Sequence, residues 1–203
     1  MSDLSNDDHR EAMKALKAEQ DARIIAATEE KSLLIVNTGD GKGKSTSGFG
    51  LVIRNLGWNL PVGIVQFGKS KTWITGEARF FERFGDLVTH SIAGDGFTWD
   101  TQDREGDVAR ARAGWEEAKA MISTGKLSLV LLDEINIMLS YRYLPEDEVV
   151  SFLATKRPAT THVVATGRGA PEALCAAADL VTEMREVKHP FHAGIKAQRG
   201  VEF

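Results

Sequence analysis

Cysteine is almost absent from this chain of 203 residues, which contains one, Cys175. A single cysteine cannot form a disulfide within the chain, and it excludes a zinc site built from several thiolates. The sequence therefore shows no sign of an oxidising compartment, and we expect the protein in the cytoplasm.

Long hydrophobic runs are also missing from the sequence. No apolar stretch approaches the roughly 20 residues that a membrane-spanning helix needs. Residues 1–31 lack the apolar core of a signal peptide. The sequence predicts a protein that is neither exported nor embedded in a membrane.

A surplus of basic residues is the third feature that the chain lacks. It contains 25 Lys and Arg against 29 Asp and Glu, which gives a formal net charge of -4. Proteins that bind nucleic acids normally carry a basic surplus, because phosphate contacts supply most of their affinity. The charge argues against nucleic acid as the main partner, whereas a few well-placed cations suffice for a small anionic ligand.

The length and composition are those of one globular unit with an appendage. Hydrophobic residues make up 42% of the chain and charged residues 27%. These fractions exclude a disordered, collagen-like or coiled-coil chain and support a sizeable buried core. Since about 150 residues is a typical domain size, the chain has no room for two full domains.

The appendage is an N-terminal helical arm, residues 1–30. Residues 5–31 are rich in charge and contain no Gly or Pro, which predicts a helix that Ser5 or Asn6 can cap. Its apolar stripe is too thin to build a core. Two interpretations stay open: a solvated extension, or an arm that folds over a site or a partner.

Residues 31–203 read as a three-layer α/β domain. Short apolar runs that predict strands lie at 33–36, 62–67, 87–89, 127–132, 162–165 and 180–181. Helical segments lie between them, near 45–56, 76–84, 103–123, 146–156 and 171–178. Strands that are apolar throughout are covered on both faces, and intervening helices are the crossovers that parallel pairing requires. We therefore expect a mostly parallel central sheet.

A phosphate-binding loop is the strongest motif, with the sequence TGDGKGKST at 38–46. It lies between the first predicted strand and the helix that follows, which is the setting that such a loop needs. Its candidate ATP-binding residues are Gly39, Asp40, Gly41, Lys42, Gly43, Lys44, Ser45 and Thr46. Glycines let backbone N–H groups approach phosphate oxygens, and the helix adds its positive N-terminal end. We expect Lys44 to neutralise phosphates and the Ser45 hydroxyl to bind Mg²⁺.

A second motif is the apolar strand that ends in Asp133 and Glu134. The carboxyl ends of parallel strands face the ligand, so both acids are candidate ligands of the phosphate-bound metal. Other strands separate this one in sequence from the phosphate loop, which favours the RecA-like branch of P-loop folds.

Two further segments follow predicted strands. Phe97 and Trp99 lie in the sequence GDGFTW at 94–99, where they form either a lid on the core or a platform for a flat ligand. Arg168 lies in TGRG at 166–169, where it either approaches phosphates or belongs to a structural turn. Residue chemistry alone leaves both pairs of alternatives open.

From Ala26 to Phe203 the chain resembles the CobA/BtuR-type corrinoid adenosyltransferases. The resemblance rests on the phosphate loop, one residue shorter than the usual motif, and on LDE at 132–134 and TGRG. It rests also on VQF at 65–67, TWxxGE at 72–77, GFTWDTQ at 96–102 and VKHPFHAGIKAQRG at 187–200. Of these motifs, the GFTW and VKH…GxKAQ elements are much more specific than the phosphate loop. Asp40 stands where the family usually has Asn, which adds an anion beside the triphosphate, and Ser45 stands where it usually has Thr.

The resemblance implies an activity and its cofactors. The family transfers the 5′-deoxyadenosyl group of ATP to the cobalt of cob(I)alamin or related corrinoids and releases triphosphate, in adenosylcobalamin biosynthesis or salvage. It implies Mg²⁺ as cofactor and a catalytic role for Lys44 in stabilising the leaving group. It also implies that ATP lies reversed relative to other P-loop proteins. Phe97 and Trp99 would bind the lower face of the corrin and exclude an axial ligand, which makes them catalytic.

The resemblance also implies a homodimer and a reduced flavoprotein as electron donor. One alternative function is a P-loop phosphotransferase or ATPase that acts on another small molecule. Another is a regulatory nucleotide-binding protein whose acidic arm contacts a partner. The specific motifs favour the adenosyltransferase.

Overall fold

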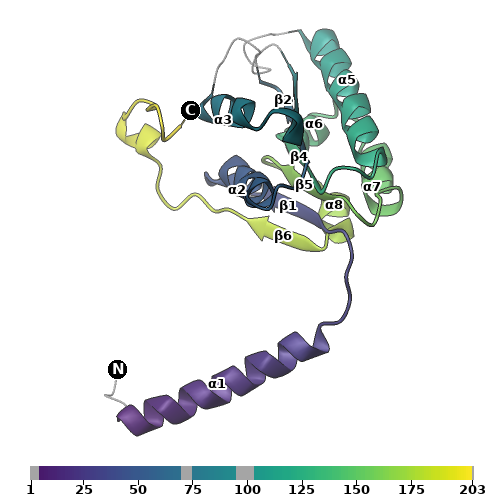
Figure 1. The fold of residues 1–203 in the computed structure, drawn as a ribbon. Helices are drawn as coiled ribbons and strands as arrows, with labels where there is room; N and C mark the ends of the chain where they lie inside the picture. The colour runs from purple at the N-terminus through teal and green to yellow at the C-terminus, as the bar shows by residue number, and fades with distance from the viewer. Residues whose placement is uncertain (1–4, 70–74, 95–102, 203) are drawn as a thin grey trace. The chain divides into compact units, whose positions relative to one another are not determined.

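The computed structural model describes residues 5–69, 75–94 and 103–202 of the chain (Figure 1). The chain divides into two compact units, Met1–Lys31 and Ser32–Phe203. The first contains one helix and the second contains the sheet.

The described residues form six strands: β1 (Leu34–Thr38), β2 (Val62–Phe67), β3 (Val88–Ala93), β4 (Leu129–Asp133), β5 (His162–Thr166) and β6 (Leu180–Glu183). The α-helices are α1 (Asn6–Ala26), α2 (Lys44–Gly57), α3 (Gly76–Phe81), α5 (Arg104–Ser123), α6 (Ile135–Ser140), α7 (Glu146–Thr155) and α8 (Glu172–Ala177). The 3₁₀ helices are η1 (Glu82–Leu87) and η2 (Pro190–Ala193). All the strands and helices expected from the sequence are therefore present.

The sheet has the strand order β3-β2-β4-β5-β1-β6, and every neighbouring pair is parallel. This confirms the expectation of a parallel sheet. Strand β5 separates β1, which leads into the phosphate loop, from β4, which carries the acidic pair. That separation is the RecA-like arrangement, because a single strand lies between the two functional strands.

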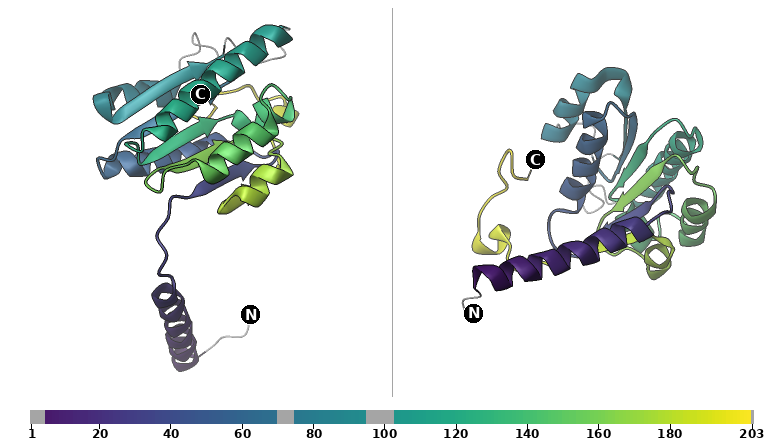
Figure 2. Two further views of the ribbon diagram at one scale, coloured as in Figure 1. Left: turned by 90° about the vertical axis from the view of Figure 1, so that its right-hand side faces the viewer. Right: turned by 60° about the horizontal axis from the view of Figure 1, so that its bottom comes forward.

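Alternate residues of the buried strands face two different hydrophobic clusters. In β4, Leu129 and Leu131 pack with α2 and α3, whereas Val130 and Leu132 pack with the cluster that includes α5, α6, α7 and α8. Figure 2 shows the helices along both faces of the sheet. Because both faces are covered, the strands are apolar throughout, as the sequence pattern required.

The larger cluster includes Trp115 in α5, which is 1% exposed and among the largest buried side chains. Its ring packs edge-on against Phe152 with a centroid distance of 5.4 Å, and its indole N–H donates to Glu148 at 2.8 Å. The indole is thus buried with its one polar group satisfied, as a stable core requires.

Helix α6 and the 3₁₀ helix η2 were not expected from the sequence. The residues of α6 begin directly after the acidic pair and continue the apolar run of β4. A short apolar segment carries the same signal as a strand or as a buried helix, so the pattern did not separate the two.

Helix α1 forms a unit without buried residues. Ser5 is its N-cap, and its hydroxyl accepts a hydrogen bond from the N–H of Asp8 at 3.2 Å. Ion pairs one turn apart join Lys17 to Asp21 and Glu19 to Arg23. The helix ends at Ala26, before the end of the charged segment. Among the described residues, no helix has the length and hydropathy to span a bilayer.

Removing residues 1–31 should leave the stability of the remaining unit unchanged. Helix α1 buries no side chain, so its loss should change the free energy of unfolding by less than about 0.5 kcal/mol. Thermal unfolding of the full chain and the truncated chain measures this. Trp115→Ala is the positive control and should cost about 3–5 kcal/mol. A comparable loss on truncation would contradict the prediction.

Candidate active site

The phosphate loop joins β1 to α2, and the segment that follows β6 packs against it and accepts one of its hydrogen bonds. Gly39 has φ 91° and Gly43 has φ 109°, in the left-handed region that favours glycine. A Cβ on Gly39 would lie 2.4 Å from the carbonyl oxygen of Met184, and the N–H of Gly41 donates to the same oxygen at 2.7 Å. The tight turn therefore depends on glycine and on a strand distant in sequence.

Lys44 begins α2 and folds back over the loop. Its ammonium donates to the carbonyl of Gly41 at 2.5 Å, and the residue is 7% exposed. Burial, with the guanidinium of Arg168 nearby, lowers the pKa of Lys44 below its ordinary value. The lysine is thus held inside the loop, at the positive end of the helix.

The other candidate ATP-binding residues differ in exposure. Gly41 is buried, Gly39, Gly43 and Ser45 are half-buried, and Asp40, Lys42 and Thr46 are exposed. The ammonium of Lys42 pairs with Glu202 near the C-terminus. Lys42 is therefore directed towards the C-terminal segment.

Arg168 reaches the phosphate loop from the carboxyl end of β5. Its guanidinium donates to the carbonyl of Asp40 at 3.2 Å. The sequence left open whether this residue approaches phosphates or belongs to a turn, and the structure brings it to the loop. The loop therefore has a second cation beside it, in addition to Lys44.

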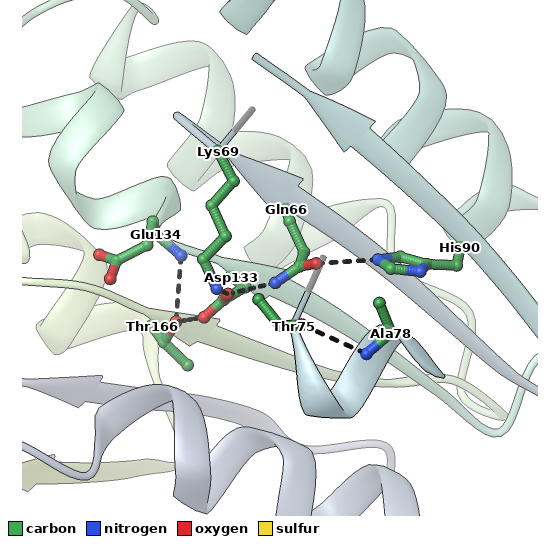
Figure 3. Close-up of polar contacts among 8 residues, drawn as sticks. All are labelled: Gln66, Lys69, Thr75, Ala78, His90, Asp133, Glu134 and Thr166. Carbon is green, nitrogen blue, oxygen red and sulfur yellow. Dashed lines mark hydrogen bonds and ion pairs between the residues drawn. The ribbon is translucent and has the colours of Figure 1, made fainter. Parts of the chain in front are cut away.

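Asp133, at the end of β4, is fully buried and multiply hydrogen-bonded (Figure 3). Its Oδ1 accepts from the hydroxyl of Thr166 at 2.8 Å. Its Oδ2 accepts from the Gln66 amide at 2.9 Å and from the Lys69 ammonium at 2.8 Å, and the Ser45 hydroxyl also hydrogen-bonds to this carboxylate. Burial alone would raise the pKa of Asp133, but Lys69 and the donated hydrogen bonds outweigh it and lower the pKa.

Glu134 lies beside Asp133 but has a different environment. Its backbone is left-handed, with φ 65°, and its N–H donates to the hydroxyl of Thr166 at 3.1 Å. Its side-chain Oε2 is buried and has no hydrogen-bond partner among the described residues. Burial, together with the Asp133 carboxylate, raises the pKa of Glu134. The sequence grouped the two acids together, but both carboxylate oxygens of Asp133 accept hydrogen bonds, whereas Oε2 of Glu134 has no partner among the described residues.

Sequence reasoning missed the polar residues of β2 and β3 that complete this network. The amide oxygen of Gln66 faces the Nε2 of His90 at 2.9 Å, so His90 must donate from that nitrogen. Burial and the nearby Lys69 lower the pKa of His90, which favours its neutral form. Two signals were available: the VQF motif of the family resemblance contains Gln66, and both Gln66 and Lys69 lie at or just beyond the carboxyl end of a buried strand.

Asn136 in α6 is a second residue that the sequence did not single out. It is fully buried, and its amide donates to the carbonyl oxygens of Asn37 at 3.3 Å and Gly167 at 3.0 Å. It therefore ties the end of β1, which enters the phosphate loop, to the segment that carries Arg168.

Phe97 and Trp99 lie outside the described residues. The segments on either side end at Gly94 and begin again at Asp103, which caps α5. Among the described residues, no group of three or more His, Cys, Asp or Glu side chains is placed to hold a metal ion.

The fold and this site define a P-loop nucleotide-binding protein of the RecA-like type. The phosphate loop, its lysine and the acidic pair meet at the carboxyl edge of one parallel sheet, with β5 between the two functional strands. The model of the family of ATP:corrinoid adenosyltransferases BtuR/CobO/CobP matches residues 30–203. The chain belongs to this family.

Curated relatives match along nearly the whole chain. A corrinoid adenosyltransferase from Sinorhizobium sp. is 52% identical over 200 residues, covering 97% of this chain and 93% of the relative. One from Pseudomonas aeruginosa is 50% identical over 195 residues, covering 96% and 95%. One from Escherichia coli K12 is 43% identical over 200 residues, covering 98% and 100%. The resemblance drawn from the motifs is thereby confirmed.

Glu134→Gln should stabilise the ligand-free protein at neutral pH. Below the unfolded pKa of roughly 4.3, the Glu134 carboxyl is protonated in both the folded and the unfolded state, so it does not destabilise the fold. Because the pKa of Glu134 is raised in the folded state, the free energy of unfolding falls as the pH rises through that folded pKa. At pH 7.5 the variant should therefore melt about 2–5 °C higher than wild type, and the difference should vanish near pH 4.

Melting curves of both proteins across this pH range test the prediction. Glu148→Gln serves as the control of opposite sign, because hydrogen bonds from Trp115 and Lys119 lower the pKa of Glu148. A Glu134→Gln variant that melts lower than wild type at pH 7.5, or a difference in melting temperature that does not depend on pH, would contradict the description of Glu134 as a destabilising buried carboxylate.

Proposed function

We propose that this protein transfers the 5′-deoxyadenosyl group of ATP to the cobalt of a reduced corrinoid and releases inorganic triphosphate. The observation that carries this proposal is the convergence of Lys44, Arg168 and the acidic pair on one phosphate loop. This convergence occurs in a chain whose match to corrinoid adenosyltransferases covers almost its full length.

The chemistry needs charge stabilisation and no general base. The Co(I) electron pair forms the bond to C5′ of the ribose, the C5′–O bond breaks, and its electron pair stays on the α-phosphate oxygen. Negative charge therefore develops on the triphosphate. Lys44, Arg168 and the N–H groups at the start of α2 are preorganised cations and dipoles next to the loop, which is the main way enzymes stabilise such charge.

The residues present fit a magnesium ion bound together with ATP. Glu134 Oε2 is a buried carboxylate oxygen without a partner, and the half-buried Ser45 hydroxyl lies beside Asp133. Mg²⁺ usually takes one or two protein ligands plus phosphate oxygens and waters. We propose Ser45 and Glu134 as its ligands, and Asp133 as the residue that orients Ser45. The ion would neutralise charge on the triphosphate.

The proposal extends to several features suggested by the resemblance. Phe97 and Trp99 would bind the lower face of the corrin and keep axial ligands from the cobalt. A homodimer, a reduced flavoprotein as electron donor and a cytoplasmic location complete the proposal.

A phosphotransferase using the same loop is the alternative enzyme, and it would release ADP. A regulatory nucleotide-binding protein would bind ATP with no dependence on a corrinoid. Analysis of the products formed from ATP and chemically reduced cobalamin separates the three functions, because only the adenosyltransferase releases triphosphate together with an adenosylated corrinoid.

Lys44→Ala should lower the rate of triphosphate release by at least about 100-fold, on the scale of removing a main electrostatic stabiliser. The fold should survive, since the lysine donates to a loop carbonyl and is not part of the hydrophobic clusters. Lys156→Ala, at the end of α7, is the remote control. Near-normal turnover by Lys44→Ala would remove the loop from the mechanism.

Trp99→Ala and Phe97→Ala should separate reduction from transfer. If the aromatics keep cobalt four-coordinate, each variant should fail when a mild protein donor must reduce Co(II) in the site. Each should be much less affected when Co(I) is supplied by a strong chemical reductant. If the two rings only cover the core, both assays should fall together with thermal stability, since truncating a buried aromatic costs about 3–5 kcal/mol. Equal losses in both assays would refute the corrin-face role.

A further inference from the structure

Lys69 is a cation at the edge of the site, described so far only as the partner of Asp133 and a neighbour of His90. It follows β2, two residues beyond Phe67, and its ammonium lies 2.8 Å from Oδ2 of Asp133. The Lys69 side chain is 22% exposed, whereas that of Asp133 is 0% exposed. The lysine therefore has access to the site that the carboxylate itself lacks.

Asp133 does not depend on Lys69 for its hydrogen bonds. Oδ2 also accepts from the Gln66 amide, and Oδ1 accepts from Thr166. The orientation of Gln66 is set by His90, which donates to the amide oxygen and so turns the amide nitrogen towards Asp133 (Figure 3). If Lys69 moved away, neither carboxylate oxygen would be left without a donor.

The ammonium of Lys69 is also a neighbour of the phosphate loop. Ser45 hydrogen-bonds to the same carboxylate, so both groups lie around one buried anion. The positive charges of Lys69, Lys44 and Arg168 all act on Glu134. Lys69 follows β2 and Arg168 follows β5, and these two strands lie on opposite sides of β4 in the sheet. The cations therefore surround the acidic pair and the loop.

We propose, on the basis of the proposed function, that Lys69 is a further catalytic residue. When ATP binds, the Lys69 ammonium leaves the ion pair with Asp133 and contacts the triphosphate instead. A lysine suits this exchange because its ammonium is a compact charge on a flexible stem. It donates hydrogen bonds and transfers no proton: the broken C5′–O bond leaves its electron pair on the triphosphate, and the cation stabilises that charge. Gln66 and His90 hold Asp133 in place during the exchange.

A different role for Lys69 is that of a counter-ion for buried Asp133 alone. Removing one partner of a buried ion pair is destabilising in itself. The two roles differ in their effect on a free anion, because a counter-ion has no contact with triphosphate. Binding of inorganic triphosphate therefore distinguishes them without a corrinoid and without turnover.

The experiment measures binding of inorganic triphosphate with Mg²⁺ by calorimetry, for wild type, Lys69→Met and the exposed-site control Lys126→Met. We expect Lys69→Met to weaken triphosphate binding by roughly 10- to 100-fold, the range of a charge-assisted hydrogen bond, and Lys126→Met to leave it unchanged. Lys69→Arg should restore part of the affinity. Wild-type affinity in a folded Lys69→Met protein would overturn the proposal.

A second comparison guards against a destabilised variant. Adding Lys69→Met to Asp133→Asn removes both members of the ion pair, so the folding penalty of an unpaired buried charge disappears. If Lys69 binds triphosphate, the double variant should melt like Asp133→Asn but bind triphosphate at least about tenfold more weakly than Asp133→Asn. Equal affinities would show a counter-ion only. If wild type itself bound neither triphosphate nor ATP, the proposed function would fail first.

Discussion

The buried carboxylate of Asp133 is the interaction on which the site depends. An unpaired charge in the interior is costly, so a fully buried carboxylate requires donors from every side. Gln66 and Lys69 come from β2 and its end, Thr166 from β5, and Ser45 from α2. This one group therefore sets the relative positions of three strand ends and the helix that follows the phosphate loop.

The phosphate loop depends in turn on segments that are distant in sequence. Met184, after β6, accepts the N–H of Gly41, and Arg168, after β5, donates to the carbonyl of Asp40. Asn136 joins the carbonyls that lie just before the loop and just before Arg168. The strands on both sides of β1 thus contribute contacts that hold the loop, which fits its proposed work of binding a flexible triphosphate in one orientation.

The neighbouring acids illustrate how stability and function divide between adjacent residues. Asp133 is satisfied, and its pKa is lowered despite burial. Glu134 is buried with an unpartnered oxygen, and its pKa is raised. A carboxylate kept in an unfavourable environment is poised to accept a cation, whereas a satisfied one is suited to hold its neighbours. Asp133 is the last residue of β4, whereas Glu134 lies beyond the strand, with a left-handed backbone at the start of α6.

Local patterns were sufficient for much of this protein. The apolar runs, the glycine-rich loop with Lys44 and the acidic end of β4 predicted a parallel α/β sheet with its ligand edge, because each is a signal within a few residues. They did not reveal α6, whose apolar residues continue those of the strand. They also did not reveal the partners of Asp133, since Gln66, Lys69, His90 and Thr166 become neighbours only through the order of strands β3, β2, β4 and β5. Strand order is decided by packing across the whole sheet, so the sequence by itself determined the loop and the acids, and the tertiary structure decided which acid is held and which is left open.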